Sequence, residues 1–150
     1  MRAVIQRVQN CSVTIDGNVF SSIGKGLMIL IGIEDADEKE DIDWLASKIV
    51  NLRIFDDENG IMNLSATDIK AELMIVSQFT LMAQTRKGNR PSYIRAAKGG
   101  FSKPMYDLFC DTVQKTSGLK VQKGVFGADM KVALVNDGPV TIIIDTKNRE

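Results

Sequence analysis

Apolar residues alternate with polar ones at the start of the chain and later form longer uninterrupted runs, a pattern that predicts a β-sheet. The stretch RAVIQRVQNCSVTIDGNVF is typical of two short strands, with turn chemistry at Asp16–Gly17. The continuously apolar segment from Gly26 to Ile33 indicates a strand buried on both faces. Further strands are expected in LRIF, in ELMIVSQFTL from Glu72 to Leu81, and in LKVQKGVFGADMKVALVN and PVTIIID near the end.

Two segments carry apolar residues at helical spacing. Asp37 can cap the first helix, and Glu40, three residues later, can complete a capping box. The apolar face of this helix consists of Ile42, Leu45, Ala46, Ile49 and Val50. The second helix is expected to begin at Ser102, with Pro104 in its first turn, where the missing N–H is harmless. Gly118 can close this helix.

The order of these elements predicts a single α+β domain over residues 1–150. We expect a mixed, mostly antiparallel sheet with a barrel-like core and two main helices packed on it. The length is that of one compact domain, and the 44% hydrophobic and 25% charged fractions are normal for a soluble globular protein. The polar tail TKNRE is expected to be frayed.

Membrane and secretory classes are disfavoured by the sequence. No apolar run approaches the roughly 20 residues that a membrane span needs. The start, MRAVIQRV, is typical of a first strand rather than of a signal peptide. The two cysteines, Cys11 and Cys110, have no metal-type spacing. A reduced chain in the cytoplasm, without a membrane partner, is therefore expected.

Charge is balanced overall, with 19 basic and 19 acidic residues, but it is unevenly spread. No acidic residue occurs between Glu72 and Asp107, whereas the ten residues from Glu34 to Asp43 include seven. The acid-free region holds Arg86, Lys87, Arg90, Arg95, Lys98 and Lys103. Such a local basic face can bind a phosphate backbone, or it can be a solvated loop whose charges pair with the acidic helix. The sequence leaves both interpretations open.

The chain contains no histidine, which removes the commonest general base and the commonest zinc ligand. Cys110 could be a nucleophile, but it follows Phe109 near the buried face of the second helix, without an assignable base. A structural role is favoured for it. The acidic clusters lie at a helix start and in a turn, where carboxylates serve as caps. The sequence predicts neither a metal nor a cofactor.

Backbone groups and hydroxyls remain as candidates for chemistry. The segment SQFTL ends a core strand with Ser77, Gln78 and Thr80, and backbone N–H groups exposed there can form an oxyanion hole. Thr80 could be a nucleophile only with an activating base, which the sequence does not offer nearby. A strand fraying into a loop explains the same composition. Taken alone, FGADM is typical of a structural loop and NDGPVT of a rigid turn.

Together, SQFTL and NDGPVT resemble the two signature motifs of the D-aminoacyl-tRNA deacylases, also called D-tyrosyl-tRNA deacylases, in order and at the family's spacing. The resemblance continues along nearly the full length through MRAVIQRV, WLASKIVNLRIFDDENGIMNLS, TRKGNRPSY and GVFGADMKVALVNDGPVT. Neither signature departs from the family pattern. Tyr93 stands where phenylalanine is more usual, a change that keeps the ring.

The resemblance implies a homodimer that hydrolyses the ester between a D-amino acid and the terminal adenosine of tRNA. It also implies release of glycine, which lacks the side chain that chirality checking excludes. In that family the Gly-Pro bond is cis, and the dipeptide reaches into the pocket of the other subunit. Carried over, Gly138 and Pro139 take this role. A backbone wall there can clash with an L side chain, and a glycine without a Cβ lets it approach closely.

The same resemblance assigns the remaining site residues. The adenosine end of the pocket, which is the expected catalytic segment, consists of Ser77, Gln78, Phe79 and Thr80. Backbone N–H groups near Phe79 and Thr80 are expected to hold the oxyanion, while the terminal 2′-hydroxyl of the RNA supplies the base. Phe126 and Met130 are expected to contact the substrate. The candidates for the acceptor-stem phosphates are Arg86, Lys87, Arg90 and Arg95.

Two interpretations from other classes stay open. A non-enzymatic RNA- or nucleotide-binding module explains the basic stretch and the missing base, but it does not explain Gly-Pro between two strands. The aromatic content of 6% also offers few stacking platforms. A structural strand-pairing dimer, in which Gly-Pro only ends an edge strand, is the third interpretation.

Overall fold

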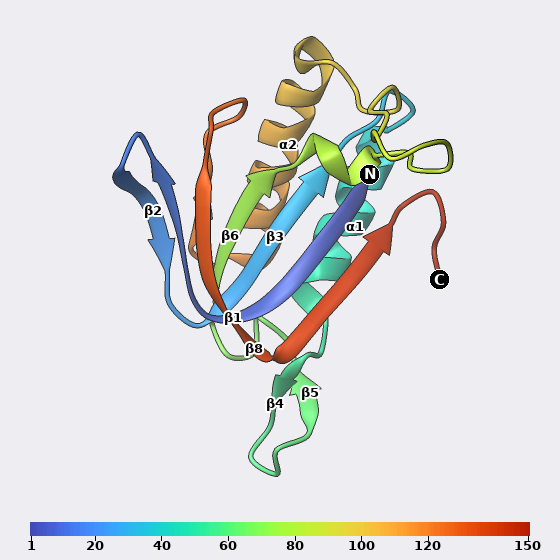
Figure 1. Ribbon diagram of the computed structural model, residues 1–150. Coiled ribbons are helices and arrows are strands. Elements are labelled where there is room, and N and C mark those ends of the chain that lie inside the picture. The colour runs from blue at the N-terminus through green and yellow to red at the C-terminus, as the bar shows by residue number, and fades with distance from the viewer.

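In the computed structural model, which describes residues 1–150, the long first strand pairs with three other strands. The strands are β1 (Arg2–Ile15), β2 (Asn18–Ile23), β3 (Gly26–Gly32), β4 (Phe55–Asp56), β5 (Met62–Leu64), β6 (Glu72–Ser77), β7 (Val121–Lys123) and β8 (Lys131–Asp145). The helices are α1 (Lys39–Asn51), the 3-10 turn η1 (Phe79–Met82) and α2 (Gly99–Ser117). Figure 1 shows α1 and α2 behind the sheet and the β4–β5 hairpin projecting from it. No helix is long and apolar enough to cross a bilayer.

Strand β1 holds the sheet together because its two halves have different neighbours. Residues 2–8 pair with β3, residues 11–15 pair with β2, and β8 runs antiparallel along almost its whole length. The pairs β3–β6 and β6–β7 are parallel, so the sheet is mixed and mostly antiparallel, as predicted. The chain turns at Asp16–Gly17 as expected, but β1 is one strand of 14 residues rather than a short one.

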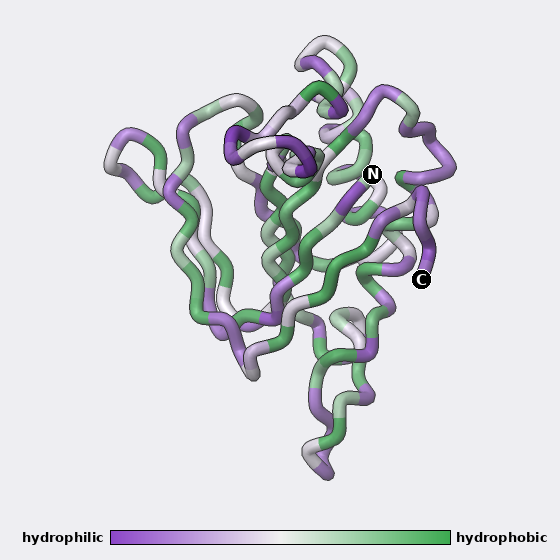
Figure 2. Tube along the Cα trace, turned by 45° about the vertical axis from the view of Figure 1, so that its right-hand side comes forward, coloured by the Kyte–Doolittle hydropathy of each residue, from purple (hydrophilic) through white to green (hydrophobic).

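The sheet has two hydrophobic cores, one on each face of its central strands. Side chains alternate along β3, so that Leu27, Ile29 and Ile31 face the helices whereas Met28 enters the second cluster. That second cluster is closed by β2 and the first half of β8. In Figure 2, hydrophobic positions follow the central strands, and hydrophilic ones gather in the turns and at the C-terminus. The expectation that β3 is buried on both faces is confirmed.

Helix α1 begins one residue later than the sequence suggested. Glu38 is the residue at the cap, and its amide donates to the carboxylate of Asp41 at 2.9 Å. Asp37, the predicted cap, is buried instead, where it accepts hydrogen bonds from the Met1 amine and from the Glu34 amide. Burial raises the pKa of Asp37, although these two donors act in the opposite direction. The N-terminal amine thus competes successfully for the carboxylate expected at the cap.

Helix α2 begins three residues before the predicted Ser102. The glycines at 99 and 100 are helical, so Pro104 lies inside the helix and not in its first turn. The hydroxyl of Ser102 donates to the carbonyl of Lys98 at 3.1 Å, within this added turn. Gly118 closes the helix with a φ of +64°, as predicted. Two adjacent glycines concealed the true start, because glycine is a poor helix former.

The C-terminal tail is anchored, contrary to the expectation that it frays. Thr146 is buried, and the ammonium of Lys147 donates to Asp41 at 2.7 Å. Burial alone would raise the pKa of Asp41, but hydrogen bonds from Lys147, the Glu38 amide and Thr146 lower it to about 2. The guanidinium of Arg149 lies 4.4 Å from the centre of the Trp44 ring. A polar composition therefore concealed specific contacts with α1.

Candidate active site

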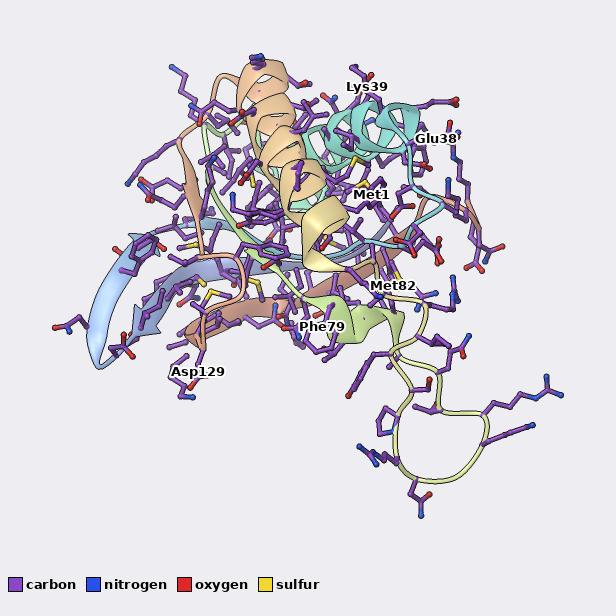
Figure 3. All side chains as sticks on the ribbon, turned by 90° about the horizontal axis from the view of Figure 1, so that it is seen from above. Met1, Glu38, Lys39, Phe79, Met82 and Asp129 are labelled. Carbon is purple, nitrogen blue, oxygen red and sulfur yellow. The ribbon has the colours of Figure 1, made fainter.

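A cavity of about 340 Å³ opens where β3 and β6 end. One wall carries Ser77, the last residue of β6, and Gln78 and Phe79, which follow it. The opposite wall carries Phe126 and Met130 from the segment between β7 and β8. The structure therefore brings together five of the residues that the sequence assigned to catalysis or substrate binding. Seen from above, Phe79 and Asp129 lie on the same side of the molecule, on these two walls (Figure 3).

The first wall forms because β6 ends in a tight turn against β3. The amide of Gln78 donates to the carbonyl of Ile31 at 2.7 Å, and the chain then enters η1. Gly32 permits this close approach, since a Cβ there would lie 2.9 Å from the Cβ of Leu81 and 3.1 Å from the Gln78 carbonyl oxygen. The sequence suggested a strand continuing to Leu81. Instead β6 ends at Ser77 and η1 begins at Phe79, so that Gln78 and Phe79 line the cavity.

Backbone amides are the donors that this turn offers. The amide of Leu81 donates to the Gln78 carbonyl, but those of Phe79 and Thr80 come too early in η1 to have an acceptor within it. Thr80 itself is next to the cavity wall, and its hydroxyl accepts a hydrogen bond of 2.5 Å from the Gln78 side-chain amide. An amide cannot remove a proton from a hydroxyl at neutral pH. The contact therefore orients Thr80 without activating it.

The second wall is tied to the first through the carbonyl of Ile75. This oxygen accepts hydrogen bonds from the Gly124 amide at 3.0 Å and from the Tyr106 hydroxyl at 2.8 Å. The ring of Phe126 packs on Tyr106 with 5.9 Å between ring centres. Burial raises the pKa of Tyr106, so its hydroxyl stays protonated. Tyr106 thus holds the two walls at a fixed separation.

The cavity lining contains almost no ionisable side chains. Asp129 is the one ionisable residue in its lining, and this exposed carboxylate lies 2.9 Å from the ammonium of Lys131. Burial raises the pKa of Cys11 to about 11 and that of Cys110 to about 12, so both thiols are protonated at neutral pH. Both side chains are buried outside the cavity lining, which agrees with a structural role. No cluster of three or more potential metal-ligating side chains occurs.

Residues 4–145 match the family model described as D-Tyr-tRNA(Tyr) deacylase. The chain belongs to the D-Tyr-tRNA(Tyr) deacylase family. It is 63% identical to a protein of Parabacteroides distasonis and 61% identical to one of Flavobacterium psychrophilum, both called D-aminoacyl-tRNA deacylase. Each alignment covers 100% of both chains. The resemblance read from the sequence, and the class of ester hydrolase that it implied, are confirmed at the level of the family.

Two solved structures resemble this member of the deacylase family. One is described as the c-Myc DNA Unwinding Element Binding Protein, with a TM-score of 0.92 and 40% identity over 97% of this chain and 98% of the other. The second is described as a probable eukaryotic D-amino acid tRNA deacylase, with a TM-score of 0.82 over 95% and 97% of the two chains. Its 17% identity makes it a likeness of fold. The predicted α+β class is confirmed.

In this deacylase-family chain, Gly138 and Pro139 do not reach their own cavity. They lie in β8, whose halves pair with β1 on either side of Arg7 while residues 137–140 bulge outward. The chain does not reverse there, so NDGPVT is a bulge within one strand and not a turn between two. The Gly138–Pro139 bond is cis, and both residues are exposed. The bend in β8 lies at the end of the sheet opposite η1 (Figure 1).

Arg7 anchors this bulge, although the sequence did not single it out. Its side chain is 7% exposed, and Nε lies 3.1 Å from the carboxylate of Asp137. Nη1 donates to the Ile54 carbonyl at 2.7 Å. The side-chain amide of Asn136 closes the base of the bulge by donating to the carbonyls of Arg7 and Val140 at 2.9 and 3.0 Å. The available signal was a cation at a position of β1 where the alternation demands an inward-facing residue.

The basic residues predicted to contact RNA divide into two groups. Arg86, Lys87 and Arg90 are exposed and form no ion pair, and they lie on a loop that reaches away from the body (Figure 3). Arg95 differs, because its guanidinium lies 2.8 Å from the carboxylate of Glu34. Pairing with the acidic segment, one of the two interpretations left open, therefore applies to Arg95. The other three cations remain free for a phosphate.

Proposed function

We propose that this chain hydrolyses the ester joining a D-amino acid to the terminal adenosine of tRNA, and that it also releases glycine from tRNA. Family membership and the names of full-length relatives support the reaction class. The observation that carries the mechanism is the cavity itself. Beside it η1 begins with amides that have no acceptor within the turn, and the one ionisable residue of the cavity lining, Asp129, is exposed and paired with Lys131. Such a site suits a reactive ester better than an amide.

The proposed chemistry divides the work between protein and RNA. Apolar side chains and the polar edge at Ser77 and Gln78 hold the terminal adenosine. Water adds to the ester carbonyl as its proton passes toward the neighbouring 2′-hydroxyl of the ribose. The amides of Phe79 and Thr80 donate to the oxygen that becomes negative. The ester bond then breaks as the 2′-hydroxyl passes its own proton to the departing 3′-oxygen, which releases the amino acid and the 3′-hydroxyl. Positioning and electrostatics of this kind account for much of many rate enhancements.

Chiral selection is proposed to come from a second copy of the chain. Gly138 and Pro139 are exposed, firmly anchored and outside the lining of their own cavity, which supports a role in the cavity of a partner. In a homodimer, their carbonyls would meet the amino group of the substrate and leave no room for an L side chain. Val135 and Ile143 of the same strand are 46% and 68% exposed, which supports a contact between copies along β8. We place this reaction in the cytoplasm, where tRNA is charged.

A binding module without activity is the second candidate, favoured by the three unpaired cations. One solved structure at 40% identity is described as a DNA-binding protein, which is a property of that protein. Binding of this kind would leave the cavity and the anchored bulge without a purpose. A release assay separates the two functions.

The first prediction concerns stereoselective release. Purified, EDTA-treated protein is mixed with tRNA charged with D-tyrosine, L-tyrosine or glycine, and release of the amino acid is followed over time. We expect rapid release of D-tyrosine and glycine, and release of L-tyrosine close to the rate without protein. Binding of tRNA without any release would favour the module. Equal release of both enantiomers would contradict the proposed chiral wall.

The second prediction concerns Gly138→Ala. The φ of Gly138 is +118°, which an L residue rarely adopts, and a Cβ would lie 2.9 Å from Cγ2 of Val140 and 3.1 Å from both Nη2 of Arg7 and the Val140 backbone nitrogen. The bulge is therefore strained by the substitution. We expect kcat/KM on D-tyrosyl-tRNA to fall about 100-fold, because a displacement near 1 Å in a positioned group has that effect. The control is Gly17→Ala, at a φ of +78° in the distant β1–β2 turn. Nothing lies within 4 Å of a Cβ at that position, so this variant tests a positive φ without a clash. Its melting temperature should fall less than that of Gly138→Ala, and its activity should stay unchanged. Unchanged kinetics in folded Gly138→Ala would remove this role.

The third prediction separates Thr80 from the RNA hydroxyl. Thr80→Ala should keep kcat within about tenfold, because a group that transfers no proton does not supply the usual 10²- to 10⁴-fold. With the unaltered protein, a substrate that ends in 2′-deoxyadenosine should be hydrolysed with a kcat about 10²- to 10⁴-fold lower. Thr112→Ala, which removes a hydroxyl bonded to the Leu108 carbonyl on α2, controls for stability. A trapped acyl-threonine together with loss of turnover in Thr80→Ala would contradict the proposed mechanism.

The fourth prediction concerns salt. If Arg86, Lys87 and Arg90 contact phosphates, log kcat/KM on tRNA below saturation should fall with log salt concentration, with a slope of about −2 to −3. The slope on D-aminoacyl-adenosine should be close to zero. Arg90→Ala should reduce the tRNA slope by about 0.7 to 0.9. The exposed, unpaired Lys115→Ala on α2 should leave it unchanged. Equal slopes on both substrates would argue against phosphate contacts.

A further inference from the structure

Two aromatic side chains form an exposed pair at the edge of the cavity. The ring centres of Phe79 and Tyr93 lie 5.1 Å apart at an interplanar angle of 75°, an edge-to-face arrangement. Phe79 is 57% exposed and Tyr93 is 39% exposed. The next residue, Ile94, is 83% exposed. Single exposed apolar residues are ordinary, but a grouped aromatic pair beside a cavity indicates a contact surface.

The pair is held in place on both sides. Phe79 belongs to η1 and lines the cavity. On the other side, the backbones of Gln84 and Ser92 exchange hydrogen bonds of 2.8 and 3.0 Å, which closes the base of the basic loop next to Tyr93. The Tyr93 carbonyl accepts a further bond of 2.9 Å from the Ala96 amide. The rings are therefore presented on anchored backbone, so little ordering is needed when a ligand binds.

We infer that Phe79 and Tyr93 form a stacking subsite for the base of the nucleotide that precedes the terminal adenosine. The inference rests on the proposed function, since it takes the cavity as the adenosine site. Phe79 both lines the cavity and is exposed, so a single-stranded 3′ end that leaves on this side would pass over its ring. The unstacked bases of such a strand bind on aromatic faces, largely regardless of sequence. The pair lies where the next base emerges.

Charge selects a nucleic acid as the occupant of this surface. The cations Arg86, Lys87 and Arg90 belong to the loop whose base carries Tyr93, and none of them forms an ion pair. A polyanion whose bases meet the rings and whose phosphates meet the loop satisfies both features at once. An apolar face of a second copy would leave these cations without partners. A second copy of the chain packed on the aromatic pair is therefore an alternative that the experiment below distinguishes.

The test compares three D-tyrosyl esters of increasing length, those of adenosine, of CpCpA and of complete tRNA, at fixed high salt. For the unaltered protein we expect kcat/KM to rise about 5- to 150-fold from adenosine to CpCpA, the range for stacking of one base. Tyr93→Ala should abolish most of this rise, and Tyr93→Phe should keep it. Phe20→Ala, at a 56% exposed ring on β2, is the matched control and should keep the rise.

A binding measurement separates this inference from the proposed function. A CpCpA analogue with 2-aminopurine as its middle base changes fluorescence when that base stacks on an aromatic ring. We expect quenching with the unaltered protein and with Tyr93→Phe, and its loss with Tyr93→Ala. Quenching without hydrolysis of any ester would contradict the proposed function and leave the subsite standing.

Three results would overturn the subsite itself. One is hydrolysis with no preference for CpCpA over adenosine. Another is a fall in kcat/KM of Tyr93→Ala by the same factor on the adenosine and CpCpA esters, which would indicate a structural role. The last is a change in oligomeric mass of Tyr93→Ala, measured by light scattering, without any effect on quenching. That result would assign the aromatic pair to a contact between copies.

Discussion

The parallel pairing of β3 with β6 is the constraint on which the candidate site depends. It brings the ends of two buried strands together, and one further hydrogen bond, from the Gln78 amide to the Ile31 carbonyl, turns the chain into η1. Gly32 allows the turn to come close enough for that bond. The Ile75 carbonyl of β6 then accepts hydrogen bonds from the Tyr106 hydroxyl and the Gly124 amide, which fix the opposite wall. The cavity is in this sense a product of the sheet.

A second rigid feature lies at the far end of the same sheet. The bulge in β8 is fixed by the buried guanidinium of Arg7 and by the side chain of Asn136, which takes the place of missing ladder bonds. The cavity and the bulge are rigid for different reasons and are separated by the length of the strands. Under the proposed mechanism, a single chain holds both components of a site and cannot combine them within itself.

Much of the architecture could be predicted from the sequence because the central strands are strongly patterned. The alternation in β1 and the unbroken apolar run of β3 gave the sheet and its class. The candidate site came from a resemblance of motifs, since composition alone makes SQFTL a fraying strand. The errors arose where tertiary contacts outweigh local preference. The Met1 amine bonds to Asp37, which is therefore not the helix cap. Lys147 bonds to Asp41, which anchors a tail that its polar sequence suggested would be frayed. Arg7 was missed because its partners are more than 45 residues away along the chain.

One consequence follows from the scarcity of ionisable groups in the cavity lining. The catalytic acids and bases of an enzyme usually determine the pH dependence of its rate. Here the single carboxylate of the lining, Asp129, is at the exposed rim and paired with Lys131. In the reaction proposed, the proton moves between the attacking water and the ribose hydroxyl beside the ester, and neither of these belongs to the protein. The protein then contributes the position and the electrostatic environment of the ester, and any pH dependence of the chemical step comes from the RNA substrate.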